Sequence, residues 1–448
     1  MHHTFRGGVH PNDQKALSSQ APLQAFDPKG EMVFPVAQHI GKPAKPVVRK
    51  NDAVRVGQLI AQADGYVSAN IISSCSGTVK AIEKRRIISG AMAECIVIDN
   101  DGLFTPIDGL GEETDTSGLS AGEILAKVQQ AGIVGLGGAG FPTHVKLKPA
   151  NPAGIRYVIA NGAECEPYLT CNDQLMRTQA QAIIDGMRLI LRLFPNAKGY
   201  VGIEDNKPEA IAAMKAAAGT DIAVLALHTK YPQGGEHNLI QTVTGLDYPV
   251  AKLPADAGCI VCNVGTIYAV ERAVGHNEPL FRHVLTVSGD AVEKPSNFIV
   301  RDGTCFAELV EACGGLKSGV TLKKALSGGP MMGFAASSLN VHVQKTTNGL
   351  TLLGEDPAET AQSKMTACLH CGRCTTVCPA GLLPQLMAEA AEVQDYERYE
   401  KKLYGLECVA CGSCTYICPA KRPLTQTFKQ MKAEITARKR AAQAGGAK

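Results

Sequence analysis

The sequence predicts a multidomain α/β protein, with a central parallel sheet, β-rich segments beside it and a helical, cysteine-rich C-terminal domain. Three observations predict this class. Short buried strands alternate with amphipathic helices between residues 119 and 278. Short strands broken by glycine turns precede that region. Two runs with the spacing C-x2-C-x2-C-x3-C-P lie near the end of the chain, at 368–379 and 408–419.

The composition excludes some classes of function. At 448 residues the chain has room for roughly two to four domains, and 45% of its residues are hydrophobic. Its net charge of +3 gives no basic footprint for nucleic acid. No apolar run approaches the roughly 20 residues of a membrane helix, and no signal peptide opens the chain. We therefore expect a protein that is soluble by itself or held at a membrane by partners.

The N-terminal part is predicted to be rich in β-strands. Residues 1–30 carry little pattern, so we expect an irregular arm. From 31 to 108 short strands alternate with glycine turns, and the stretches 50–60 and 76–82 resemble a lipoyl/biotinyl-type barrel-sandwich domain. That family carries its prosthetic group on a hairpin lysine, but the corresponding tip at 64–70 has no lysine. We expect a structural or interaction role for this domain.

The central region, residues 119–278, is predicted to be a Rossmann-like α/β domain. It follows a polar, glycine-containing linker at 109–118. Ser120 and Glu123 have the spacing of a capping box at the start of a helix. The alternation of strand and helix favours a mostly parallel sheet with helices on both faces. Strands are predicted at 157–160, 200–203 and 221–227, and further helices at 174–194 and from Asn206.

Two further units are expected after the parallel sheet. Residues 279–350 contain short strands and one short helix, which predicts a β-grasp-like module of the SLBB type. The cysteine runs lie in a predicted helical domain at 360–430. A basic, alanine-rich tail at 431–448 is predicted to be a frayed, solvated helix. The strands of the module are predicted at 284–288, 297–300 and 324–327, with the helix from Cys305.

The two cysteine runs are the most specific signal in the chain. Each is the run that holds an iron–sulfur cluster in bacterial ferredoxins, where the fourth cysteine of one run ligates the cluster of the other. Zinc sites pair C-x2-C motifs across a long gap, and nothing indicates the secretion that favours disulfides. The sequence therefore predicts two 4Fe-4S clusters. One is expected on Cys368, Cys371, Cys374 and Cys418, and the other on Cys408, Cys411, Cys414 and Cys378.

A glycine-rich stretch at 135–140, followed by Phe141 and Lys146, suggests a second cofactor site. Backbone N–H groups in such a loop can approach a phosphate or a flat ring, and the lysine adds positive charge. Alone, the stretch is equally a plain tight turn, because it fits neither a Walker loop nor a clear G-x-G-x-x-G. Its context favours a ligand, since polar residues follow a predicted strand and lead into two helices, where open α/β sheets bind ligands. These residues are Asn161, Glu164, Glu166, Tyr231, Gly234, Glu236, Asn263 and Thr266.

Together these motifs make a family resemblance specific. The chain resembles the C subunit of the Rnf electron-transport complex over essentially its whole length, and its central part is similar to the NADH-binding flavoprotein subunit of respiratory complex I. Residues 6–11, the glycine loop, residues 161–167 and 231–236 and the cysteine runs carry the match. The resemblance implies a non-covalent FMN that takes hydride from NADH, and two 4Fe-4S clusters that pass single electrons onward. By position it implies FMN contacts from Gly135, Gly137, Gly138, Lys146, Asn161, Glu164, Asn263 and Thr266, with Gly140 and Gly234 in the same loops, and NADH contacts from Phe141, Glu166, Tyr231 and Glu236.

The resemblance also implies a place in a larger assembly. It predicts the NADH-oxidising subunit of a membrane-bound, ion-translocating NADH:ferredoxin oxidoreductase, peripheral at the cytoplasmic face of the bacterial inner membrane. Its partners would be the iron–sulfur B subunit, the membrane subunits and, indirectly, ferredoxin. Two alternatives stay open: a soluble diaphorase such as a microcompartment cobalamin reductase, and a ferredoxin-like adapter whose glycine loops are only structural. The cofactors supply the chemistry, so no side-chain nucleophile or general acid is expected.

Overall fold

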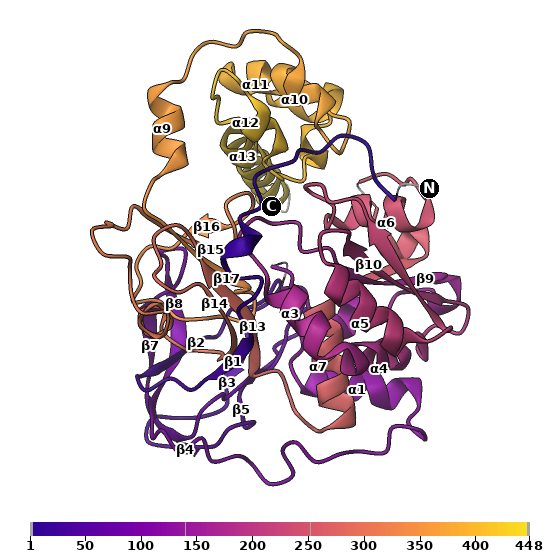
Figure 1. Cartoon of the computed structure of the whole chain (residues 1–448), viewed down its shortest axis with the longest axis vertical. Helices are drawn as coiled ribbons and strands as arrows, with labels where there is room; N and C mark the ends of the chain where they lie inside the picture. The colour runs from indigo at the N-terminus through magenta and orange to yellow at the C-terminus, as the bar shows by residue number, and fades with distance from the viewer. Residues whose placement is uncertain (1–2, 139, 251, 446–448) are drawn as a thin grey trace.

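The computed structural model describes residues 3–138, 140–250 and 252–445, which form a β-rich part, a parallel α/β part and a helical C-terminal part (Figure 1). In the β-rich part, a four-stranded and a three-stranded antiparallel sheet share one hydrophobic core that includes the fully buried Phe34, Ile60 and Ile96. The predicted barrel sandwich is therefore confirmed. The first sheet is β2 (Met32–Pro35), β8 (Met92–Asn100), β7 (Gly77–Arg86) and β4 (Ala53–Val54), and the second is β3 (Lys45–Pro46), β5 (Leu59–Gln62) and β6 (Ile71–Ile72).

The central sheet is parallel throughout, in the order β11-β10-β9-β12. The chain starts at β9, moves outward through β10 and β11, and returns to β12 on the other side of β9. In an open parallel sheet, such a reversal opens a crevice at the carboxyl ends of the two strands. The strands are β9 (Tyr157–Gly162), β10 (Lys198–Glu204), β11 (Ile222–Leu227) and β12 (Cys259–Asn263), and the helices are α1 (Ala121–Gln130), α2 (Thr143–Lys146), α3 (Cys171–Thr178), α4 (Ala180–Leu191), α5 (Pro208–Ala218), α6 (Glu236–Thr244) and α7 (Val264–Gly275).

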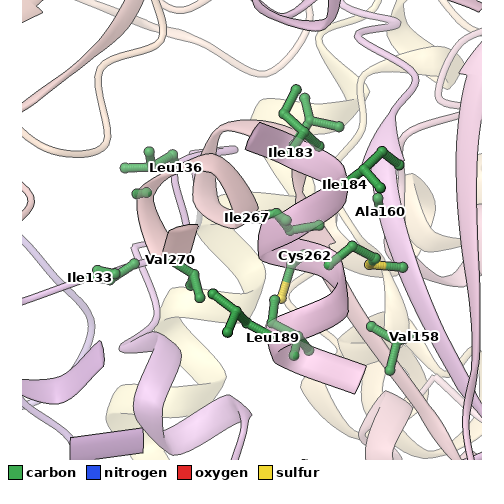
Figure 2. Packing of buried hydrophobic residues seen from close by; sticks show 14 of the residues in the cluster. Ile133, Leu136, Val158, Ala160, Ile183, Ile184, Leu189, Cys262, Ile267 and Val270 are labelled. Atoms are coloured by element: carbon green, nitrogen blue, oxygen red, sulfur yellow. The ribbon is translucent and has the colours of Figure 1, made fainter. Parts of the chain in front are cut away.

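The sheet packs against α4 and α7 through a hydrophobic core (Figure 2). Val158 and Ala160 of β9 and Cys262 of β12 point into it, each at most 4% exposed. Leu136, from the glycine-rich stretch, packs into the same core and is 7% exposed. The hydrophobic core therefore holds one end of the glycine loop against α7. The other labelled members of the cluster are Ile133, Ile183, Ile184, Leu189, Ile267 and Val270.

The single helix predicted at 174–194 is two helices, α3 and α4, so that prediction was wrong. Gln179 separates them with a non-helical backbone, at φ −127° and ψ 30°. The Thr178 hydroxyl donates to the carbonyl of Gln174 at 2.8 Å, a bond of the kind that bends helices. The carbonyl of Ser19, far away in the sequence, accepts from Gln174 and Arg177 and fixes α3 in its own direction.

The next module is a mixed sheet that also contains a strand from the N-terminal segment. β1 (Leu23–Phe26) pairs in parallel with β14 at the edge of this sheet, so the prediction of an irregular arm for residues 1–30 was wrong there. The buried Asn297 of β14 causes this, because its side-chain amide donates to the carbonyls of Ser18 and Ala21. The other elements are β13 (Arg282–Ser288), β14 (Ser296–Arg301), β15 (Lys324–Ser327), β16 (Phe334–Ala335), β17 (Gly349–Leu353) and α8 (Phe306–Ala312).

The C-terminal helices from residue 373 onward pack around the two cysteine runs. The prediction of a solvated tail from residue 431 was wrong for its first turns. Met431 and Ile435 are each 3% exposed in the core of this domain, and Lys432 donates to the carbonyl of Cys408 at 2.8 Å. Across the described residues, no helix has the length and apolar character needed to cross a membrane. The helices are α9 (Pro357–Ser363), α10 (Arg373–Thr376), α11 (Pro384–Glu392), α12 (Ser413–Ile417) and α13 (Leu424–Gly445).

Candidate functional site

The two cysteine runs fold into two cavities, and each cavity takes one cysteine from the other run. We call the first the inner cluster site and the second the outer cluster site. The fourth cysteine of each run thus lies with the three leading cysteines of the other, as the ferredoxin pattern predicts. The inner cluster site is lined by Cys378, Cys408, Cys411 and Cys414, and the outer cluster site by Cys368, Cys371, Cys374 and Cys418.

The loops around the two cavities share the same backbone conformation. His370 and Ala410, at equivalent places in the two runs, both have a left-handed backbone, with φ 51° and 53°. Their amides donate to the sulfurs of Cys368 and Cys408 at 3.4 Å, as amides do around cluster sulfurs. Among the described residues, no group of His, Cys, Asp and Glu is close enough to hold a single metal ion. Each cavity is lined by four cysteines, the number of thiolates that a 4Fe-4S cluster takes.

The two sites differ in their exposure. In the inner site Cys411 and Cys414 are buried, whereas Cys371 of the outer site is exposed. Burial raises the pKa of Cys414 to about 12. Its thiolate therefore needs the positive charge of iron to form at neutral pH.

Tyr231 joins the inner cluster site to the α/β domain. Its hydroxyl donates to the carbonyl of Cys411 at 2.6 Å, and only 2% of the residue is exposed. Apolar side chains surround this contact, including Val9 and Met331. The Tyr231 hydroxyl is thus bonded inside the interface with the cluster domain, which argues against its predicted contact with NADH.

The carboxyl ends of β9 and β12, where this topology places a crevice, bring together the predicted cofactor residues of both strands. Asn161 and Asn263 are paired across the two strands at their carboxyl ends. The Asn161 amide donates to the carbonyl of Gly234 at 2.9 Å, which draws the 231–236 loop to the crevice. Asn263 begins α7 by accepting from the amide of Gly265 at 2.8 Å.

The glycine loop is held beside this crevice by a hydrogen bond to α7. The buried Thr266 hydroxyl accepts from the amide of Leu136 at 3.0 Å, and a hydroxyl of this kind can still donate its hydrogen. Gly138 has φ 97°, and a Cβ there would meet nothing within 4 Å. A Cβ on Gly137 would lie 3.5 Å from that of Asn263. The loop therefore presents bare backbone beside the N-terminus of a helix, a cradle that suits the phosphate or ring of a flavin.

Two other residues of the loop have structural roles. Gly140 turns away from the crevice, because a Cβ there would lie 2.7 Å from the side chain of Thr346. Its carbonyl accepts from the amide of Ile40, which ties the loop to the barrel sandwich. The backbone of Phe141 closes the loop by accepting from Gly135 at 2.9 Å. Gly140 thus has a packing role in this loop, which argues against its predicted contact with the cofactor.

Lys146 and Glu236 form an ion pair at the crevice. The lysine Nζ lies 2.9 Å from the carboxylate of Glu236 and 2.9 Å from the carbonyl of Val261. Burial alone lowers the pKa of Lys146, but the Glu236 charge and hydrogen bond outweigh it and the pKa is raised. Lys146 is therefore a fixed positive charge beside the end of β12. The predicted flavin lysine and the predicted NADH glutamate lie in one site.

The carboxylates of the two other predicted glutamates are bonded to backbone amides. The carboxylate of Glu164 accepts from the amides of Asn172 and Asp173 at 2.7 and 3.2 Å, and so caps α3. The carboxylate of Glu166 accepts from the amides of Met331 and Met332 at 2.5 and 3.1 Å. The Glu166 carboxylate thus holds a turn of the neighbouring module, which argues against its predicted contact with NADH.

Two buried lysines that the sequence patterns do not reveal shape the loop after β9. Lys15 donates to the carbonyls of Glu166 and Leu169 at 3.0 and 2.6 Å. Lys207, paired with Glu204, donates to the carbonyl of Ala163 at 2.8 Å. Their burial depends on contacts between distant segments, so no local pattern marks them.

Family comparisons agree with this division of the chain. Residues 128–272 match the Nuo51 FMN-binding domain, and residues 3–103 match the RnfC barrel sandwich hybrid domain. Residues 284–335 match the SLBB domain, and residues 362–436 match a 4Fe-4S dicluster domain. The chain therefore carries FMN and 4Fe-4S clusters, as the sequence predicted.

Relatives match the chain over nearly its whole length. The chain is 43% identical over 432 residues to the C subunit of the proton-translocating ferredoxin:NAD(+) oxidoreductase complex of Clostridium ljungdahlii, covering 96% of this chain and 94% of that protein. It is 42% identical over 442 residues to the C subunit of the Na(+)-translocating ferredoxin:NAD(+) oxidoreductase complex of Acetobacterium woodii, covering 98% of each. A third relative, the C subunit of the ion-translocating oxidoreductase complex of Rhodobacter capsulatus, is 40% identical over 97% of this chain and 84% of its own length. The chain belongs to the family of C subunits of the Rnf-type, ion-translocating ferredoxin:NAD(+) oxidoreductases.

Proposed function

We propose that this subunit oxidises NADH at the β9–β12 crevice and passes electrons through the inner and then the outer cluster site to the iron–sulfur B subunit of its complex. In this proposal the subunit is peripheral, beside the membrane subunits at the cytoplasmic face of the bacterial inner membrane, and ferredoxin exchanges electrons with it only indirectly. The observation that carries the proposal is the bond from Tyr231 to the Cys411 carbonyl, because it joins the cofactor crevice directly to one cluster loop.

The residues at the crevice bind and orient the cofactor and the substrate. The flavin supplies the conversion between two-electron hydride transfer and one-electron transfer. In this proposal Glu236, which is paired with Lys146, and Phe141 contact the nicotinamide nucleotide. The residues that would hold the FMN are Gly135, Gly137, Gly138, Lys146, Asn161, Asn263 and Thr266.

The order of the clusters follows from burial. The inner site contacts the α/β domain through Tyr231 and is shielded from water by Val9 and Met331. The outer site exposes Cys371, and the neighbouring Leu369 is 63% exposed. An exposed cluster ligand beside exposed apolar surface suits electron exit to a partner protein.

Two alternatives are weaker. A ferredoxin-like adapter has no use for the FMN-binding domain matched by residues 128–272. A soluble diaphorase, such as a microcompartment cobalamin reductase, has no membrane partners. An affinity-tagged chain isolated from gently solubilised membranes should therefore bring with it the B subunit and the membrane subunits. Recovery of the chain alone, with full NADH oxidation, would favour the soluble diaphorase.

The two glutamates should respond differently to substitution. We expect Glu236→Gln to raise the KM for NADH several-fold, since losing one hydrogen bond costs about 0.5–1.5 kcal/mol. FMN should stay bound because Lys146 keeps its bond to the Val261 carbonyl. Glu166→Gln, the matched control, should leave the KM unchanged. The assay is NADH oxidation with ferricyanide, which draws electrons from FMN. An unchanged KM in Glu236→Gln, or a higher one in Glu166→Gln, would contradict this placement of NADH.

A further inference from the structure

We propose that residues 5–11, here called the N-terminal strap, position the inner cluster site for electron transfer from the flavin, and that Gly7 and Gly8 are the residues on which this depends. The inference rests on the proposed function. The strap contains the Arg6–Pro11 stretch, to which the cofactor sites described above assign no role. In Figure 1 the indigo N-terminal segment passes between the C-terminal helical domain and the α/β domain.

The strap is bonded to both domains within three residues. The amide of Gly8 donates to the carbonyl of Val377, next to the inner-site ligand Cys378, at 2.9 Å. Val9 exchanges two backbone bonds with Tyr231, at 2.8 and 2.9 Å. Tyr231 in turn donates to Cys411, so the strap, the flavin-site loop and the cluster loop form one hydrogen-bonded unit.

The space on each side of the strap admits only glycine. Gly7 has φ 79°, and a Cβ there would lie 2.9 Å from the carbonyl oxygen of Cys378. Gly8 has φ 83°, and its Cβ would lie 2.7 Å from the carbonyl oxygen of Tyr231. Both obstacles are main-chain atoms, which cannot rotate away as a side chain does. A side chain at either position must push the cluster loop and the flavin-site loop apart.

The start of the strap is fixed to the α/β domain. Phe5 is 4% exposed, and its carbonyl accepts from Lys230 Nζ at 2.9 Å. The same ammonium group lies 4.6 Å from the centre of the Phe5 ring, a cation–π contact. Lys230 also precedes Tyr231, so this anchor sets the strap against the flavin-site loop. Because the start of the strap is anchored to the α/β domain, a side chain at Gly7 is expected to displace the cluster loop instead of the strap.

The strap touches the main chain of the inner site, not its sulfur ligands. It contacts the carbonyls of Val377 and Cys378. The SLBB module approaches the same site separately, since a Cβ added to Gly412 would lie 3.1 Å from the Met331 carbonyl oxygen. Loss of the strap contact is therefore expected to shift the assembled cluster rather than prevent its assembly. The strap residues are positioning residues and take no part in the chemistry.

The test compares Gly7→Ala and Gly8→Ala with Gly111→Ala in the full chain holding FMN and both clusters. Gly111 has φ 84°, but a Cβ there meets nothing within 4 Å, so this control matches the backbone strain without the obstruction. Three quantities are measured without oxygen: ferricyanide reduction by NADH, cluster content by EPR after dithionite, and the rate of cluster reduction by NADH in stopped flow. The last should fall several-fold in both strap variants, because electron tunnelling weakens steeply as the flavin and the cluster move apart. The other two quantities should match the control.

The other outcomes distinguish a positioning role of the strap from a role in folding or assembly. Wild-type rates of cluster reduction in both variants would overturn a positioning role. Equal losses of ferricyanide and cluster reduction, or loss of the inner cluster itself in both variants, would show that the strap serves folding or assembly and would also overturn it. If NADH reduces no cluster even in the wild-type chain, the proposed function fails, and that result is independent of the strap.

Discussion

Cys378→Ala is expected to remove the inner cluster and leave the outer one, although Cys378 belongs to the same run as three outer-site cysteines. The reason is that Cys378 lines the cavity of Cys408, Cys411 and Cys414. A cluster left with three thiolates loses a ligand that no other cysteine along that wall replaces. EPR of the dithionite-reduced protein should lose the inner-site signal completely.

The reciprocal variant and an unrelated cysteine supply the controls. Cys418→Ala should remove the outer cluster instead, because Cys418 lines the cavity of Cys368, Cys371 and Cys374. Cys313→Ala, at a buried position in the SLBB module, should keep both signals. Loss of the outer signal in Cys378→Ala would show that each run holds its own cluster.

Gly138→Val is expected to abolish FMN binding while both clusters remain. A valine at φ 97° is strained by about 1–2 kcal/mol, and its methyl groups would fill the open space beside the glycine loop. The clusters lie in a separate domain with its own core, so they should be unaffected. Flavin released by heat, together with EPR, measures both expectations.

The control for this variant is another glycine of similar conformation. Gly315 has φ 81°, and a Cβ added there would meet nothing within 4 Å, but this glycine lies outside the crevice. Gly315→Val should keep the wild-type FMN content. Normal flavin content in Gly138→Val would mean that the loop is only a turn.

Local patterns predicted much of the fold because they depend on neighbouring residues. Ser120 and Glu123 form the expected capping box, with both of its hydrogen bonds present. The strand predicted at 324–327 has those bounds in β15. The cysteine spacing likewise predicted that each cavity takes three cysteines from one run and the fourth from the other, and the structure has this arrangement.

Predictions failed where the outcome depends on residues far apart in the chain. β1 forms because Asn297 binds carbonyls near the N-terminus, and the break at Gln179 follows from packing against the same segment. The residue that accepts from the Tyr231 hydroxyl, Cys411, likewise lies 180 positions later in the chain. Periodicity and short motifs do not reveal partners that lie so far apart in the sequence.

The most direct test of the central claim, that electrons pass from the flavin through the inner to the outer cluster site, uses the Cys378→Ala variant. NADH is mixed with this protein without oxygen, and flavin and cluster reduction are followed by stopped-flow absorbance. Flavin reduction at the wild-type rate is expected, with an outer cluster that stays oxidised with NADH although dithionite reduces it. Reduction of the outer cluster by NADH at the wild-type rate would contradict the claim, because electrons would then bypass the inner site.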